Sequence, residues 1–243
     1  MKLVKLDATD STNLYLKNSM LSNTLDDYTV VMTKKQLKGR GQMGTTWLSE
    51  AGKNLTFSVL KNNLAMPASK QFLLNKCVSL AVSDALKEFG IPNITIKWPN
   101  DILSGHYKIC GILIENVLSG NKIQASIIGV GLNVNQTKFN DLPHVSSLKL
   151  ILGRKLELEE LLMGIVKALK KYLNLLPDTF DDNLHMLYED RLFRKDKPST
   201  FKNVDGDLFM GFIRGVSDQG KLIVGLEDDV LKEYDLKEIK LLY

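Results

Sequence analysis

Three apolar runs at residues 94–98, 109–117 and 122–134 most constrain how this chain folds. Each run is rich in β-branched residues and is bounded by polar or turn-forming residues, which is typical of strands. The last two runs are joined by Ser119-Gly120-Asn121, a hairpin signature. These runs therefore predict neighbouring strands of an antiparallel or mixed sheet.

The turn after the first run carries an unusual density of ionisable groups. Residues 97–101 read Lys-Trp-Pro-Asn-Asp, and Lys108 follows before the next strand. Buried charges are costly unless they are paired or used, so the block indicates a functional site. The mixture suits a site that gathers a phosphate-rich substrate and then accepts an amine, with Asp101 as a base or an orienting group. The alternatives are surface lysines at 97 and 108 and a turn-forming role for Asp101 after Pro99.

The remaining elements predict an α+β fold in two parts. Helical spacing and stop signals predict helices over 11–20, 68–89, 158–175 and 179–192, and strands are expected over 28–33 and 54–60. A mixed β-sheet with helices packed on it accounts for this order. After residue 194 the sequence pattern changes to five short β-like runs, which predict a small barrel. We therefore expect a catalytic domain at 1–194 and a small C-terminal β-barrel domain at 195–243.

Composition excludes several classes of protein. The 243 residues have a formal net charge of +4, which is weak support for a nucleic-acid partner. The two cysteines, Cys77 and Cys110, imply no disulfide framework and fit a reducing compartment. The three histidines are scattered without metal-ligand spacing. No signal peptide or membrane-spanning run is visible, so the expected location is the cytoplasm.

Residues 39–44 (Gly-Arg-Gly-Gln-Met-Gly) match a dinucleotide-binding pattern, but their context argues against that role. The pattern requires a helix to begin at the loop, whereas Thr45-Thr46-Trp47-Leu48-Ser49 follows here. Such a loop can still hold an anion in a nest of N–H groups, with Arg40 making bidentate contacts. A plain glycine-rich turn with a solvated arginine is the alternative.

Two further features have both a binding and a structural interpretation. Trp47 either stacks on a flat ring of a ligand or packs in the core, while Trp98 is expected in the core. Residues 129–135 (Gly-Val-Gly-Leu-Asn-Val-Asn) place an amide, Asn133, at the end of a strand whose glycines permit close approach of a ligand. A β-bulge with a turn asparagine is the other interpretation.

Together these residues resemble biotin protein ligases, also called biotin–[acetyl-CoA-carboxylase] ligases. The matching segments are 10–13, 36–41, Trp47, 97–101, 108–115 and 129–135, which run in order through most of the first 150 residues. The resemblance implies a class II synthetase-like catalytic domain followed by a small SH3-like β-barrel.

The resemblance also implies a two-step reaction. Biotin attacks the α-phosphate of ATP with the help of Mg²⁺, giving biotinyl-5′-AMP, and a lysine of a biotin carboxyl carrier domain then takes the biotin. Both first-step reactants are anions, so cations must offset their repulsion. The alternatives are a lipoate–protein ligase, which shares this logic, and a non-catalytic biotin- or nucleotide-binding module or DNA-binding regulator.

By resemblance, the site residues fall into overlapping groups. Catalysis is assigned to Arg40, Lys97, Asp101 and Lys108. Biotin binding is assigned to Ser11, Thr12, Asn13, Gln36, Gly39, Arg40, Gly41, Gln42, Lys108 and Gly111. Nucleotide binding is assigned to Arg40, Trp47, Asn100, Lys108 and Asn133. No side-chain cluster is assigned to a metal, and Mg²⁺ is expected with ATP.

Two departures from some relatives affect the expected partners. Gln42 stands where some members carry a second arginine, which leaves Arg40 as the loop's one cation and bears on how firmly the adenylate is retained. The chain also begins almost directly at the catalytic domain, so we expect no operator binding. The expected partners are biotin, ATP and a carrier domain, without DNA or membrane, and a homodimer is left open.

Overall fold

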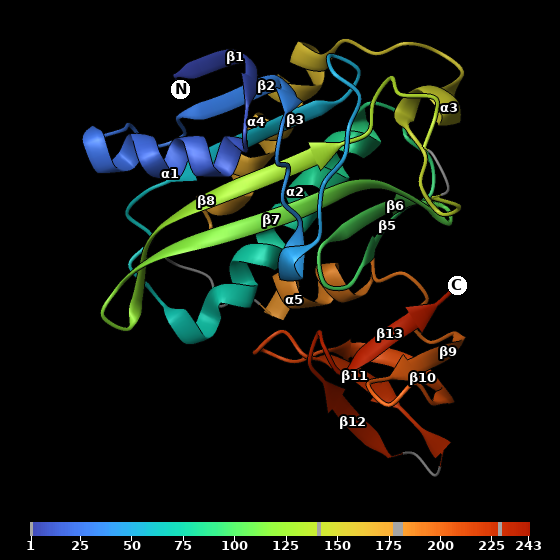
Figure 1. Cartoon of the computed structure of the whole chain (residues 1–243). Coiled ribbons are helices and arrows are strands. Elements are labelled where there is room, and N and C mark those ends of the chain that lie inside the picture. Colours follow the sequence, from blue (N-terminus) through green and yellow to red (C-terminus); the bar gives the residue numbers. More distant parts are fainter. Residues whose placement is uncertain (1, 140–141, 177–181, 228–229) are drawn as a thin grey trace.

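The structure is a computed structural model that describes residues 2–139, 142–176, 182–227 and 230–243. Its larger part is an eight-stranded sheet in the order β1-β2-β3-β8-β7-β6-β5, with β4 paired to β8 (Figure 1). The strands are β1 (Leu3–Thr9), β2 (Val30–Gln36), β3 (Leu55–Lys61), β4 (Met66–Pro67), β5 (Ile94–Lys97), β6 (Asp101–Ser104), β7 (Tyr107–Ser119) and β8 (Lys122–Leu132). β1 and β2 run parallel and the other pairs are antiparallel. The mixed sheet confirms the predicted α+β class.

Helices cover both faces of this sheet. They are α1 (Thr12–Ser22), α2 (Gln71–Glu88), α3 (Leu148–Leu152), α4 (Leu158–Leu173) and α5 (Asp182–Glu189), and short 3₁₀ turns occur at η1 (Gln42–Gly44) and η2 (Ala68–Lys70). Strand alternation separates the two cores, because successive side chains point to opposite faces. Val30 packs in the large cluster under α2 and α4, whereas its neighbour Val31 packs in the small cluster under α1.

Helix α2 forms the centre of the larger core. Its apolar spacing buries Cys77, Leu80, Ala81 and Leu86 almost completely. Gly90 follows its end with a φ of +79°, a conformation that favours glycine and stops the helix. The helix predicted over 68–89 is therefore present, with its first three residues in the 3₁₀ turn η2.

The C-terminal residues form a second, five-stranded antiparallel sheet. Its order is β12-β11-β10-β9-β13, built from β9 (Pro198–Asn203), β10 (Leu208–Val216), β11 (Leu222–Gly225), β12 (Leu231–Tyr234) and β13 (Ile239–Leu242). The five predicted strands and the small SH3-like module are thus present, below the large sheet in Figure 1. The Trp98 indole Nε1 donates to the Gly220 carbonyl at 2.9 Å and joins the two sheets. The boundary at residue 194 stays a prediction.

Some elements differ from the sequence-based expectation. Strands β1, β4 and β6 and the short helix α3 were not expected. The strand expected at 28–33 is shifted to Val30–Gln36, because Tyr28 adopts a φ of +57° in the preceding turn. The last helix covers Asp182–Glu189, and residues 179–181 of the predicted helix lie outside the described part of the chain.

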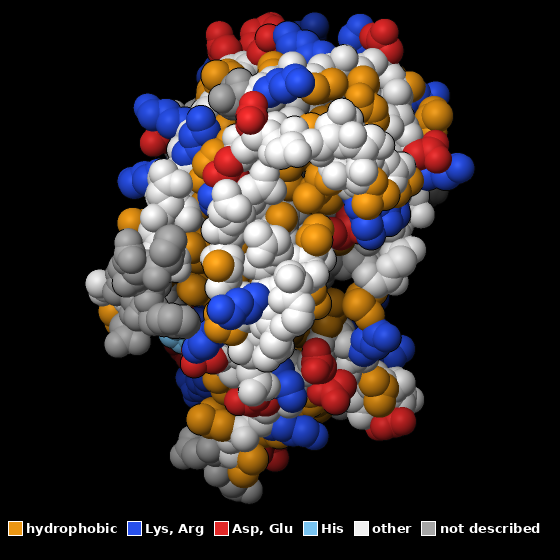
Figure 2. All heavy atoms as spheres, turned by 90° about the vertical axis from the view of Figure 1, so that its left-hand side faces the viewer, with side chains coloured by type: hydrophobic (Ala, Val, Ile, Leu, Met, Phe, Trp, Pro, Cys, Tyr) orange, Lys and Arg blue, Asp and Glu red, His pale blue; other side chains and the backbone are white. Residues whose placement is uncertain are grey.

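The described surface is mixed in charge, and Figure 2 shows basic and acidic side chains interspersed over one face. Among the described residues, no helix has the length and apolarity needed to cross a membrane.

Candidate functional site

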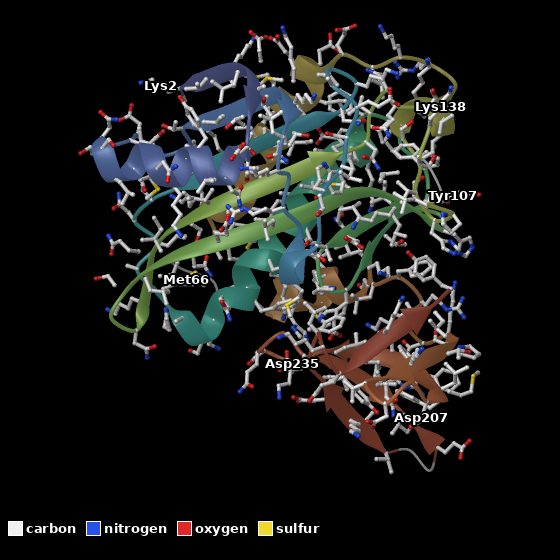
Figure 3. All side chains as sticks on the ribbon, viewed as in Figure 1. Lys2, Met66, Tyr107, Lys138, Asp207 and Asp235 are labelled. Carbon is white, nitrogen blue, oxygen red and sulfur yellow. The ribbon has the colours of Figure 1, made fainter. Side chains whose placement is uncertain are left out.

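A cavity of about 680 Å³ opens where the large sheet, the glycine loop and the small sheet meet. Its floor comes from β7 and β8, and its walls come from the start of α1, the loop 40–47, the turn 97–101 and β13. Figure 1 shows the segment between β2 and β3 crossing the face of β7 and β8, which places the loop over this floor. Figure 3 places Asp235 on the side of the small sheet that faces the large sheet, and Asp207 on the side that faces away from it.

Most residues assigned to the site by resemblance line this one cavity. They are Ser11, Thr12, Asn13, Gln36, Arg40, Gly41, Gln42, Trp47, Lys97, Asn100, Asp101, Lys108 and Gly111. Gly39 does not line the cavity: it is buried at the start of the loop, where its carbonyl accepts from the Trp47 backbone N–H at 3.0 Å. Asn133 lies in the core beside the cavity and its Nδ2 donates to the Ser146 carbonyl at 3.1 Å. Their binding roles stay predictions.

The start of α1 forms a buried polar pocket. Ser11 caps the helix, and the backbone N–H of Thr12 donates to Gln36 Oε1 at 2.8 Å. The Ser58 hydroxyl lies 2.7 Å from Thr12 Oγ1 and 2.6 Å from Asn13 Oδ1. Donor and acceptor groups in a water-poor pocket fix the orientation of a polar ligand strongly, because an unmatched partner there is costly.

A carboxylate links this pocket to the glycine loop. Asn13 Nδ2 donates to Glu115 Oε2 at 2.7 Å, and Arg40 Nη2 lies 3.4 Å from the same oxygen. Sequence reasoning assigned no role to Glu115 or Ser58. The sequence did contain a signal for each, because Glu115 ends the apolar strand pattern of 108–115 and Ser58 interrupts that of 54–60.

The turn between β5 and β6 gathers two lysines around one carboxylate. Lys108 Nζ lies 2.7 Å from Asp101 Oδ1, and Lys97 Nζ lies 3.6 Å from Asp101 Oδ2. Burial is the main cause that holds the pKa of the Lys97 amine below its ordinary value, and Lys108 adds to this while Asp101 opposes it. Asp101 thus pairs with both lysines.

Backbone contacts fix this turn in place. Asn100 Nδ2 donates to the Ile112 carbonyl at 2.8 Å, and the Ile112 N–H donates to the Asn100 carbonyl at 3.0 Å. The Asn100 side chain therefore attaches the turn to β7 and also faces the cavity. Trp98 is half-buried against the core, as expected, and its hydrogen bond to Gly220 is an additional contact with the small sheet.

The Trp47 ring rests on a floor of two glycines. A Cβ on Gly131 would lie 2.4 Å from Trp47 Cε2, and one on Gly111 would lie 3.1 Å from Trp47 Cζ3. These glycines pair with each other across β7 and β8 in regular register, so the β-bulge interpretation of 129–135 is wrong. The loop itself is a tight turn, with the Gly41 N–H donating to the Thr45 carbonyl at 2.7 Å, and no α-helix follows it.

The small sheet also contributes to the cavity, which sequence reasoning missed. Lys202, Lys237, Lys240 and Tyr243 are among the lining residues. The three lysines, with Arg40, Lys97 and Lys108, bring six cationic side chains to a described lining whose one acidic side chain is Asp101. An anionic ligand suits this balance of charge.

The fold and this cavity define an enzyme family. The model of the Biotin/lipoate A/B protein ligase family matches residues 6–133, and the chain belongs to that family.

The chain is similar to individual proteins of this family in structure and in sequence. A biotin protein ligase from Aquifex aeolicus, solved in complex with biotin and ATP, superposes with a TM-score of 0.82 at 26% identity, over 99% of this chain and 98% of that one. The bifunctional ligase/repressor BirA of Bacillus subtilis is 28% identical over 89% of this chain, which spans 67% of that relative. The biotin–[acetyl-CoA-carboxylase] ligase of Paracoccus denitrificans is 36% identical over 53% of each chain.

Proposed function

We propose that this chain is an ATP-dependent biotin protein ligase that forms biotinyl-5′-AMP and transfers biotin to a lysine of a biotin carboxyl carrier domain. The observation that carries the proposal is the convergence of Arg40, Lys97 and Lys108 on one cavity that also contains a buried polar pocket. The similarity to a ligase solved with biotin and ATP, and to a biotin–[acetyl-CoA-carboxylase] ligase, supports the same activity.

In the first step, an oxygen of the biotin carboxylate attacks the α-phosphorus of ATP and pyrophosphate leaves. Two anions must approach each other, so nearby cations lower the barrier. Lys108 is the proposed donor to the carboxylate and α-phosphate, with Asp101 fixing its amine at 2.7 Å. Arg40, on the loop, is the proposed second cation.

The polar pocket at α1 is the proposed site for the ureido ring of biotin. A ureido group offers two N–H donors and one carbonyl acceptor, and the pocket is lined by the hydroxyls of Ser11 and Thr12 and the amides of Asn13 and Gln36. The buried Ser58 hydroxyl holds Thr12 and Asn13 from behind. The bicyclic ring then fills the inner cavity, and the carboxylate points toward Lys108. Trp47 is the proposed platform for adenine, because a flat ring stacks on a base.

In the second step, the amine of the acceptor lysine attacks the acyl carbon of biotinyl-5′-AMP. The N–C bond forms, the C–O bond to AMP breaks, and the amine loses a proton. Asp101 and Lys97 are the proposed groups that orient this amine and accept its proton, because a less basic Lys97 is neutral more often than an ordinary lysine.

We propose that Mg²⁺ enters with the nucleotide. Within the described residues, no group of three or more His, Cys, Asp or Glu side chains is placed to hold a metal, and Asp101 is already paired with two lysines. Mg²⁺ commonly binds mainly to substrate phosphates and water. This donor set therefore does not form a resident metal site.

The activity test is biotin-dependent exchange of pyrophosphate into ATP, followed by transfer to a carrier domain of acetyl-CoA carboxylase. A ligase shows both, whereas a binding module shows neither. Lipoate in place of biotin is expected to give no exchange, and exchange with lipoate alone would identify a lipoate–protein ligase instead.

Further properties remain proposals. A cytoplasmic location is supported by the two buried free thiols, Cys77 and Cys110. The mixed surface charge supports the expectation of no DNA partner, and a homodimer is tested by light scattering with and without ligands.

A further inference from the structure

Tyr243 reaches from the end of β13 into the catalytic cavity. Its ring centroid lies 5.0 Å from the ring of Phe193 and 5.0 Å from the ring of His144, both in the large part of the chain. The Lys97 amine lies over the same ring, 5.3 Å from its centroid. One aromatic side chain of the small sheet therefore contacts a proposed catalytic lysine.

The charged groups around Lys97 determine where its amine lies. Asp101 Oδ2 lies 3.6 Å from the amine, and Asp101 Oδ1 is occupied by Lys108 at 2.7 Å. Lys240 of β13 is the other cation that acts on Lys97. Two positive groups thus repel Lys97, while one carboxylate oxygen and one ring face attract it.

We propose that Tyr243 is a positioning residue: its ring holds the Lys97 amine against one oxygen of Asp101 and leaves the other oxygen to orient Lys108. The proposal rests on the proposed ligase function, because it concerns the same reaction. Without the ring, the flexible Lys97 side chain moves into the cavity, and both Asp101 oxygens become available to Lys108. The position of Lys108 at the reacting carboxylate then changes.

The same contact shields the Lys97 amine from water. Burial is the largest cause that lowers the pKa of Lys97, with Lys108 and Lys240 adding to it and Asp101 opposing it. Burial, followed by the charge of Asp101, also raises the pKa of Tyr243 itself, so its ring stays neutral at physiological pH. Removing the ring opens the amine to solvent, and the pKa of Lys97 is then expected to rise toward its ordinary value.

The variants Tyr243→Leu and Tyr243→Phe separate the ring from the hydroxyl. The matched control is Tyr234→Leu, because Lys232 lies over the Tyr234 ring at 5.0 Å in the same small sheet and neither residue lines the cavity. Acetylation of Lys97 by trace acetic anhydride, followed by mass spectrometry across pH, measures the amine in the ligand-free full chain. Initial rates of biotinyl-5′-AMP formation give kcat and the KM for biotin.

We expect Tyr243→Leu to move the labelling midpoint of Lys97 upward and to lower kcat roughly 2- to 10-fold, with the KM for biotin unchanged. Tyr243→Phe keeps the ring face and is expected to match the wild type in both readouts. Tyr234→Leu is expected to leave the Lys97 midpoint in place even where it lowers the thermal midpoint.

An unchanged Lys97 midpoint in folded Tyr243→Leu overturns the proposal, as does an equal shift in Tyr234→Leu. If Tyr243→Leu does not fold, Tyr243→Ser carries the same test, because it also removes the ring and opens the Lys97 amine to water. The labelling readout does not depend on catalysis. If the wild-type chain forms no adenylate but Tyr243→Leu still shifts the Lys97 midpoint, the ligase function is refuted and the contact is not.

Discussion

Two glycines of β8, Gly129 and Gly131, lie under the proposed biotin and nucleotide halves of the cavity. Replacing each glycine by alanine adds one methyl group and tests one half. A Cβ on Gly129 would lie 2.4 Å from Asn13 Oδ1, and a Cβ on Gly131 would lie 2.4 Å from Trp47 Cε2. The two positions are two residues apart on one strand, so they share a face. Contacts this short cannot persist, and one partner must move.

The strand is not the partner that moves. β8 is paired on both sides, by β3 and by β7, whereas Trp47 lies on a loop. Gly131→Ala is therefore expected to displace the Trp47 ring. Stacking of a base on an aromatic side chain is worth about 1–3 kcal/mol, so the Kd for ATP should rise roughly 5- to 150-fold.

Gly129→Ala acts on the other ligand. It is expected to push Asn13 away from Ser58 and Glu115, which lie 2.6 Å and 2.7 Å from its amide atoms. Loss of such buried hydrogen bonds costs about 1–3 kcal/mol, which corresponds to a similar rise, roughly 5- to 150-fold, in the Kd for biotin.

Calorimetric titration of each variant with biotin, and then with α,β-methylene-ATP (which cannot release pyrophosphate) after saturation with biotin, measures both effects. Each variant is the control for the other, and thermal unfolding confirms that both fold. If Gly131→Ala weakened biotin as much as Gly129→Ala does, or left ATP binding unchanged, the assignment of the two halves would be refuted.

Four further changes have defined expectations. Lys108→Ala should lower kcat for adenylate formation about 10²- to 10³-fold with the fold intact, because it removes a cationic donor at the reacting centre; normal pyrophosphate exchange would count against this role. Ser58→Ala should lower the free energy of unfolding by about 1–3 kcal/mol in urea, because Thr12 and Asn13 lose a buried partner. Burial holds the pKa of Lys76 below its ordinary value, so the unfolded chain binds more protons than the folded chain, and the free energy of unfolding of the wild type should rise with pH up to the ordinary lysine pKa. Lys76→Met should lack this part of the rise, which urea titrations at neutral and alkaline pH would measure. Trp98→Phe should cost about 0.5–1.5 kcal/mol in the same assay by removing the 2.9 Å bond to Gly220, and no loss would show that this bond does not stabilise the joined sheets.

Local pattern was enough to predict much of the fold. The hairpin at 119–121, helix α2 and the five C-terminal strands all follow from residue spacing and turn chemistry within short windows. The segments that carry the family resemblance also meet in one cavity, which places Arg40 and Lys108 together although 68 positions separate them in the sequence. No short window shows such a meeting, and it was predicted only through the resemblance.

The missed features depend on distant partners. Strand β1 is an edge strand in which three of the seven residues are exposed and none is fully buried, and its parallel partner β2 lies beyond a helix, so its short pattern was ambiguous. Ser58 and Glu115 are ordinary polar residues until the fold brings them to Asn13. Tyr243 belongs to a strand of the small sheet, and only the packing of the two sheets places its ring over Lys97.

The register of the large sheet explains why these residues meet. Directly paired positions in adjacent strands share a face, and one row of such pairs crosses the sheet through Lys97, Asp101, Gly111, Gly131 and Thr56. The next row on that face runs through Leu113, Gly129 and Ser58. The first row carries the charged groups and the Trp47 floor, and the second supports Asn13. A slip of one residue between β7 and β8 would turn both glycines to the opposite face and close both halves of the cavity. Strand pairing therefore sets the site as firmly as the identity of its charged residues does.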